Sequence, residues 1–223
     1  FTGNPLAGIP LHSLRSFYPL HRLLAGACRA MATLADAAPA GRPMPAAETV
    51  DEIELDEAER RLSGALMRVN HVGEICAQAL YEGQAASTSD PELREYFLGA
   101  AREEADHLAW TRKRLDELGA SPSLLNPLWY AGSLAMGLVA GRTGDKWSLG
   151  FMSETERQVE SHLESHLHRL PSADSRSRRI VEAMQADEVA HARRARELGG
   201  AELPSPVREA MRLASRVMTT VAH

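Results

Sequence analysis

The sequence has few aromatic residues, and it lacks long stretches that alternate between apolar and polar side chains. Aromatic residues make up 5% of its 223 positions, while alanine and leucine are abundant. That mixture favours helices over sheet. Without an alternating pattern of sufficient length, no strand is predicted. We therefore expect an all-α protein.

The sequence is also poor in cysteine, and its net charge is negative. The two cysteines, Cys28 and Cys76, are too few for a disulfide framework, and neither belongs to a Cys-x-x-Cys pair that would indicate a thiolate metal site. The net charge of -5 argues against a nucleic-acid partner, because such proteins usually carry a strong positive balance. Within residues 1–47, no apolar run is long enough for a secretory signal or a membrane span.

The first 47 residues differ in composition from the rest. Four arginines accompany a single acid, Asp36, and six prolines interrupt any long helix. An arginine-rich, acid-poor start is typical of an organelle transit peptide. The alternative, which we prefer, is an N-terminal extension that is disordered or that results from a wrongly assigned start of the sequence. We expect residues 1–50 to form a flexible extension and residues 51–223 to form one domain.

The remainder of the chain has the periodicity of helices. From about Leu55, apolar residues recur at steps of three, four or seven. Asp90 and Pro91 supply an N-cap and a first-turn proline for a second helix, which Gly119 would end. The same reasoning predicts a helix that ends at Gly199 and an amphipathic helix at the C-terminus. The expected helices begin near residues 55, 91, 148, 173 and 207.

An uncharged connector runs from Leu118 to Ala140 between the second and third of these helices. Its prolines limit a helix to about residues 127–141, which is about 22 Å long and shorter than a hydrocarbon core of about 30 Å. An interfacial or re-entrant helix is therefore favoured over a spanning one, and a buried core helix is the other alternative. Together with the C-terminal helix, the connector is expected to present a lipid-facing patch that includes Leu128, Trp129, Leu134, Met136 and Leu138.

Each of two similar helical hairpins carries one Glu-x-x-His motif in its second helix. The motifs are Glu104 with His107, and Glu188 with His191. Residues three apart share one face of a helix, so a carboxylate and an imidazole can approach one ion together. A single motif of this kind would more often be a surface charge pair, but two in equivalent helices are more specific. Glu103 also lies on the same face as His107. Glu104 is preferred as the ligand, because it holds the same place before His107 that Glu188 holds before His191.

The first helix of each hairpin adds one glutamate, Glu74 or Glu156. One glutamate from each of two helices and a Glu-x-x-His from each of two others is the dimetal pattern of ferritin-like bundles. Four carboxylates and two neutral imidazoles carry a charge of about -4, which offsets two ferrous ions. These ligands suit iron or manganese. The prediction is a ferritin-like four-helix bundle with an extra apolar connector helix and a C-terminal amphipathic helix.

Short runs in all four core helices match the signatures of a known family. They are RVNHVGE at 68–74, EEADH at 103–107, TERQV at 155–159 and DEVAH at 187–191. Through them, the chain resembles the demethoxyubiquinone hydroxylases of the Coq7 family over about residues 51–223. The resemblance implies a di-iron monooxygenase that hydroxylates the ring of a demethoxyubiquinol in ubiquinone biosynthesis. The alternative is another ferritin-like di-iron protein, which stores iron or removes peroxide without acting on quinones.

The resemblance also implies roles for individual residues. Two irons per chain would be bridged by Glu104 and Glu188. His162, six residues after Glu156, matches a family position near the irons. It is a candidate for a residue that contacts the ligands or that lies on the substrate side. His162 and His166, four residues apart, could also form a metal pair, but a solvated, pH-sensitive helix face is favoured for this cluster. One iron would be held by Glu74, Glu104 and His107, and the other by Glu156, Glu188 and His191.

The partners that the resemblance implies follow from this chemistry. They are a prenylated quinol, O2, an electron donor, a membrane surface and a further protein of ubiquinone biosynthesis. The expected location is the cytoplasmic face of a bacterial inner membrane, where the protein would be peripheral. The alternative location is the matrix side of the mitochondrial inner membrane.

Overall fold

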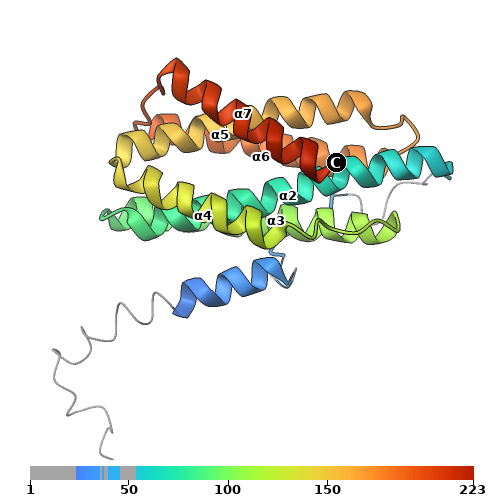
Figure 1. Ribbon diagram of the computed structural model, residues 1–223, viewed down its shortest axis with the longest axis horizontal. Coiled ribbons are helices and arrows are strands. Elements are labelled where there is room, and N and C mark those ends of the chain that lie inside the picture. The colour runs from blue at the N-terminus through green and yellow to red at the C-terminus, as the bar shows by residue number, and fades with distance from the viewer. Residues whose placement is uncertain (1–23, 36, 38–39, 46–53) are drawn as a thin grey trace, which may run out of the picture.

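The computed structural model describes residues 24–35, 37, 40–45 and 54–223, and every regular element within these ranges is a helix (Figure 1). The all-α prediction is confirmed. Two helical hairpins pair to form a four-helix bundle, and one further helix connects them while another follows the second hairpin. The hairpins consist of α2 (Glu57–Ser87) with α3 (Pro91–Glu117) and of α5 (Asp145–Arg169) with α6 (Ser175–Glu197), the connecting helix is α4 (Asn126–Arg142), and the last helix is α7 (Ser205–Ala222).

Local signals fix where the bundle helices begin and end. At the start of α2, the Asp56 carboxylate accepts from the backbone N–H of Glu59, and the Glu59 carboxylate accepts from that of Asp56, which is a capping box. Asp90 caps α3 in the expected way, with Pro91 in its first turn. Gly119, two residues past the end of α3, has a positive φ of 67°. The helix boundaries therefore follow from residues close to them in the sequence.

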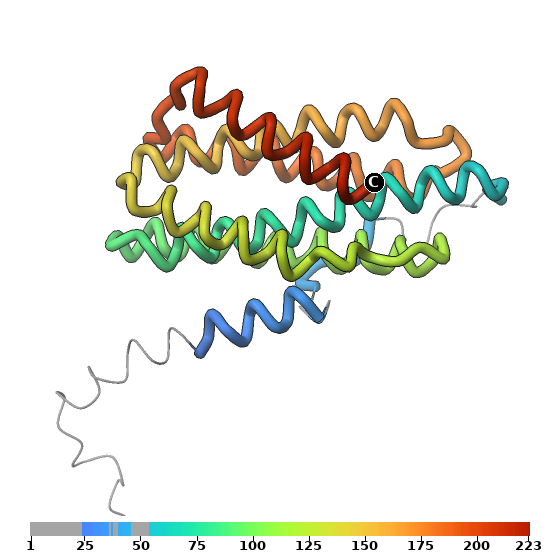
Figure 2. Tube along the Cα trace, in the orientation of Figure 1, coloured from blue at the N-terminus to red at the C-terminus, as the bar shows by residue number. Residues whose placement is uncertain are grey.

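Helix α4 lies directly against α2, so that the two backbones touch (Figure 2). A Cβ atom on Gly137 would lie 2.1 Å from the carbonyl oxygen of Leu80, and one on Gly83 would lie 2.6 Å from that of Leu134. Only glycine allows this approach. One side of α4 is thus packed on the bundle, while Leu128 and Val139 on its other side are 63% and 65% exposed. None of the described helices combines the length and hydropathy that crossing a bilayer requires.

The residues expected to face lipid on α4 divide into two groups. Leu128 and Met136 are exposed. Trp129, Leu134 and Leu138 are half-buried instead. Trp129 packs beside Val69 and Val72 of α2, and Leu134 packs in the cluster that contains Ile75 and Tyr130. These three side chains are only partly exposed, because the close approach of α2 covers part of their side of α4. The lipid-facing patch stays a prediction.

Helix α7 lies obliquely across the face formed by α2 and α5 (Figure 1). Its inner side reaches the bundle through Met218 and the buried Ala222. Its outer side carries Leu213, Val217 and Val221, which are four residues apart and all more than half exposed. The C-terminal helix is therefore amphipathic, as expected, and part of its apolar surface faces outward.

The described part of the N-terminal stretch contacts the bundle. Residues 24–34 are helical and run along its outside (Figure 2). Arg29 pairs with Glu82 of α2 at 3.2 Å, and the Thr33 hydroxyl donates to the side chain of Gln78. Further on, Met44 is buried in the main core cluster. The flexibility of residues 1–50 and the boundary at 51 stay predictions, and residues 1–23 and 46–53 lie outside the described residues.

Candidate metal centre

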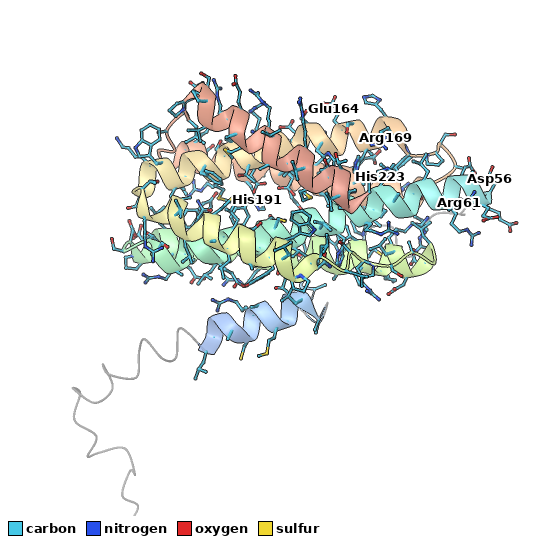
Figure 3. All side chains as sticks on the ribbon, in the orientation of Figure 1. Asp56, Arg61, Glu164, Arg169, His191 and His223 are labelled. Atoms are coloured by element: carbon cyan, nitrogen blue, oxygen red, sulfur yellow. The ribbon has the colours of Figure 1, made fainter. Side chains whose placement is uncertain are left out.

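The structure brings all six predicted ligands together in the middle of the bundle. Each is buried, with at most 7% of its surface exposed. Figure 3 labels one of them, His191, inside the bundle, whereas Asp56 and Arg61 lie at the outer end of α2. Within each of two groups, the potential ligand atoms all lie within 4.8 Å of one another. The groups are Glu74, Glu104, His107 and Glu188, and Glu104, Glu156, Glu188 and His191.

Glu104 and Glu188 belong to both groups because each carboxylate faces both imidazoles. For Glu104, Oε2 lies 2.9 Å from His107 Nδ1 and Oε1 lies 3.3 Å from His191 Nδ1. The corresponding distances for Glu188 are 3.5 Å from Oε1 and 3.8 Å from Oε2. Two oxygens of one carboxylate that point at two sites are what a bridging ligand requires.

The other two glutamates each belong to one group. Glu74 Oε2 lies 3.4 Å from His107 Nδ1, and Glu156 Oε1 lies 3.4 Å from His191 Nδ1. Glu156 also accepts a hydrogen bond from the hydroxyl of the fully buried Tyr81. The sequence analysis missed Tyr81 as a site residue. Its spacing of seven residues from Glu74 places it on the same face of α2, and that signal could have identified it.

The outer nitrogens of the two imidazoles bind acids from the opposite hairpin. His107 Nε2 of α3 lies 2.9 Å from Asp187 Oδ2 of α6, and His191 Nε2 of α6 lies 2.6 Å from Glu103 Oε2 of α3. An acid on Nε2 favours the tautomer that leaves Nδ1 free as a ligand. Asp187 and Glu103 directly precede Glu188 and Glu104 in sequence, so each Asp/Glu-Glu pair supplies one residue to the centre and one to the histidine across it.

Burial and mutual charge shift the pKa values of these groups in opposite directions. Burial raises the pKa of Glu74 to about 8, and it raises the pKa of Glu188 well above its usual range with help from the charge of Glu104. Burial acts in the same direction on Glu104, but His107 and His191 together lower its pKa. The surrounding carboxylates outweigh burial and raise the pKa values of both histidines. Without a cation, the cluster therefore needs protons to balance its charge.

Some polar atoms of the cluster lack hydrogen-bond partners among the described residues. They are Glu104 Oε1, Glu188 Oε2 and His191 Nδ1. Buried polar groups normally have a partner, and two of these three belong to the carboxylates that face both imidazoles. Metal ions at the two groups would bind these atoms and replace the protons that the cluster needs. The donor set, four carboxylates and two imidazoles, fits iron.

His162 is in neither group. Its ring lies 4.0 Å from that of His166, one turn along α5, and its Nε2 has no partner among the described residues. Burial lowers the pKa of His162 to about 4, so this histidine is neutral near pH 7. The contacts of the described residues do not link it to the ligands. Its place beside the irons or the substrate stays a prediction.

Each of the four helices contributes one glutamate, and in two of the helices this glutamate is part of a Glu-x-x-His motif. This is the site of the ferritin-like dimetal carboxylate proteins. Comparison with known sequences narrows this class. The sequence model of the ubiquinone biosynthesis protein COQ7 matches residues 61–222, and the chain belongs to that family, whose members are di-iron hydroxylases with a ferritin-like helical bundle.

Several bacterial proteins named 3-demethoxyubiquinol 3-hydroxylase are similar to this chain. The one from Variovorax paradoxus is 69% identical over 170 residues, which cover 76% of this chain and 81% of the relative. Those from Burkholderia thailandensis and an Azoarcus species are 60% and 58% identical over 195 residues, which cover 87% of this chain and 94% of each relative. The resemblance to the Coq7 family that the sequence motifs indicated is thereby confirmed.

Proposed function

We propose that this chain is a di-iron monooxygenase that hydroxylates the ring of a demethoxyubiquinol. The observation that carries the proposal is the pair of carboxylates, Glu104 and Glu188, each of which directs one oxygen toward each imidazole. They would bridge two irons. Glu74 and His107 would complete one iron site, and Glu156 and His191 the other. The relatives' shared name supports the choice of substrate.

The irons would supply the two-electron activation of O2 that insertion of oxygen at a ring carbon requires. The chain's own residues hold the ligands in place and keep the site dry. Asp187 and Glu103 orient the two imidazoles, and Tyr81 holds Glu156 through its hydroxyl. Because burial and neighbouring carboxylates also raise the pKa of Tyr81, its phenol keeps its proton and remains a donor.

Access for a prenylated substrate would come from the apolar side of the molecule. An open groove of about 690 Å³ lies between α4 and the beginnings of α5 and α7. Its walls include Met136 and Val139 of α4 and Trp147 and Phe151 of α5. Phe151 also packs on the hydrophobic cluster that contains Tyr81, the residue that contacts Glu156. We propose that the quinol's tail lies in this groove.

Exposed apolar side chains on α4 and α7, two of the helices that line the groove, support attachment to a membrane surface. Leu128 and Val139 of α4 and Leu213 and Val217 of α7 all point outward. Contiguous exposed apolar surface usually marks a binding surface, and a polyprenyl quinol is itself dissolved in lipid. We propose that the protein is peripheral on the cytoplasmic face of a bacterial inner membrane. An electron donor and a further protein of ubiquinone biosynthesis are the remaining proposed partners.

Isotope labelling tests the proposed reaction. The purified chain, loaded with iron, is given a chemical reductant, 18O2 and a short-chain demethoxyquinol, and the quinone products are read by mass spectrometry. One 18O on the ring supports the proposal. If label appears only in water and the quinol is unchanged, the chain is an oxidase or peroxidase of the same fold, because the same ligands serve those reactions too.

A strain that lacks its own hydroxylase provides the complementary test. Expression of this chain should convert the accumulated demethoxyubiquinone into ubiquinone. The matched control is the Glu104→Ala variant, which lacks a proposed bridge. Equal conversion by both proteins would contradict the proposed role of the metal centre.

A further inference from the structure

Arg42, in the N-terminal stretch, contacts the acid that orients His107. Its Nε lies 2.6 Å from Asp106 Oδ2, and its Nη2 lies 2.7 Å from Asp187 Oδ2. Asp187 is the residue that lies 2.9 Å from His107 Nε2, on the side of the ring away from the carboxylate cluster. A continuous series of charge-assisted contacts therefore leads from residue 42 to a metal ligand that lies 65 residues further along the chain.

Several contacts hold Arg42 in this position. The backbone N–H groups of Gly41 and Arg42 both donate to Asp106 Oδ1, at 2.5 and 3.1 Å. The guanidinium lies over the ring of Trp110, 4.9 Å from its centroid, and Trp110 Nε1 donates to the carbonyl oxygen of Arg42 at 3.4 Å. Asp106 is itself buried. These contacts fix both the backbone and the side chain, so the guanidinium is already placed to bind Asp187.

Among the described residues, the other half of the centre has no equivalent clamp. Glu103, which orients His191, has a side chain that is 56% exposed, whereas that of Asp187 is 26% exposed. No arginine in the described part of the chain forms an ion pair with Glu103. The two halves match in their ligands and in their crossed acids. They differ in the residues that contact those acids.

We propose that Arg42 is a positioning residue for the metal centre, which acts through Asp187 to fix the ring of His107. The inference rests on the proposed di-iron site. Residues behind a metal-bound histidine set the orientation of its ring and the basicity of its free nitrogen. The clamped half should therefore release its iron more slowly than the half that depends on Glu103.

Iron release tests this. The full chain is loaded anaerobically with two ferrous ions, ferrozine is added, and the release of each iron is followed. Arg42→Gln should speed the slower phase by roughly 3- to 10-fold, because loss of a direct partner of a ligand typically costs about 10- to 100-fold and Arg42 is one step further away. In 57Fe Mössbauer spectra, one of the two iron signals should change.

Arg29→Gln is the matched control. Arg29 also ties the N-terminal stretch to the bundle through a buried acid, and its side chain has the same 43% exposure as that of Arg42. Its partner Glu82 is not a proposed ligand. Arg29→Gln should leave both release phases and both Mössbauer signals unchanged. Equal effects of the two substitutions would overturn the proposal, because they would show that tethering of the stretch is what matters.

A double-mutant cycle distinguishes action through Asp187 from action by other routes. In an Asp187→Asn background, Arg42→Gln should add no further acceleration, and Arg42→Lys in the native background should have a smaller effect than Arg42→Gln. Unchanged release by Arg42→Gln overturns the role of Arg42 while leaving the di-iron site intact. A wild-type chain that fails to bind two irons overturns the proposed function instead, and with it this inference.

Discussion

At the scale of single residues, the proposed centre depends on two side chains that each serve both halves. Glu104 and Glu188 are deeply buried, and each directs one oxygen toward each imidazole. Glu74 and Glu156 serve one half only. The consequences of removing a glutamate should therefore depend on which pair it belongs to.

Glu104→Ala should abolish binding of both irons together, because it removes one of the two shared carboxylates and with it part of the negative charge that offsets the repulsion between the two metal ions. Iron content after desalting is the measurement. The control is Glu95→Ala on the same helix, where an exposed glutamate pairs with Arg102 on the surface. It should retain two irons. A Glu104→Ala chain that keeps one tightly bound iron would show that Glu104 is not a bridge.

His166 makes stability depend on pH in a defined direction. Burial, with the nearby charges of His162, Arg169 and His223, lowers its pKa to about 3. The unfolded chain binds a proton at about pH 6.5 and the folded chain does not, so stability is lost as pH falls below about 6.5. At pH 5 this loss should reach up to about 2 kcal/mol.

Urea unfolding at pH 7 and pH 5 measures this loss. Other groups also titrate in this range, so the wild type is compared with His166→Gln, which cannot take up the proton. The free energy of unfolding should fall less between the two pH values in the variant than in the wild type. An equal fall in both proteins would exclude His166 as a source of the pH dependence.

At the scale of elements, the contact between α2 and α4 depends on the absence of side chains. Gly137→Ala places a Cβ atom 2.1 Å from a backbone oxygen of α2, so the helices must separate. Overpacking of this kind typically costs about 1 to 3 kcal/mol. The control lies in the same helix: Gly132 is exposed, and a Cβ atom there meets nothing within 4 Å.

Gly132→Ala should stabilise the protein by up to about 1 kcal/mol through helix propensity alone, whereas Gly137→Ala should destabilise it. Urea unfolding followed by circular dichroism compares the two. Equal stabilisation by both substitutions would show that α4 moves away from α2 at no cost.

At the scale of the whole molecule, the features that were predictable from the sequence are those that local residues determine. The helices follow from periodicity, and their ends from caps such as Asp90 and stops such as Gly119. The proposed ligands were recognisable because each Glu-x-x-His lies within one helical turn. The contact of Arg42 with Asp187 joins residues 145 positions apart, and no local pattern marks it. The inward face of α4 was likewise hidden, because it depends on a glycine of α2.

This distinction changes the choice of variants that test membrane binding. Leu134 is half-buried against the core, so a charge there would disturb folding as well as any contact with lipid. Leu128 and Val139 are exposed, and they lie on the outer side of α4. Leu128→Glu combined with Val139→Glu should therefore weaken sedimentation with neutral phosphatidylcholine vesicles by about tenfold or more, because burial of each side chain contributes about 1.5 to 3 kcal/mol.

The control adds the same charge at exposed polar positions, Ser161→Glu combined with Ser165→Glu on α5. Neutral vesicles exclude a general electrostatic effect, so the control should bind as the wild type does. Iron content should be unchanged in both double variants, because none of the four positions is a proposed ligand. If vesicle binding survives in Leu128→Glu with Val139→Glu, the outer side of α4 does not face lipid. In that case α7, with Leu213, Val217 and Val221 exposed, is the remaining candidate for the surface through which the quinol enters.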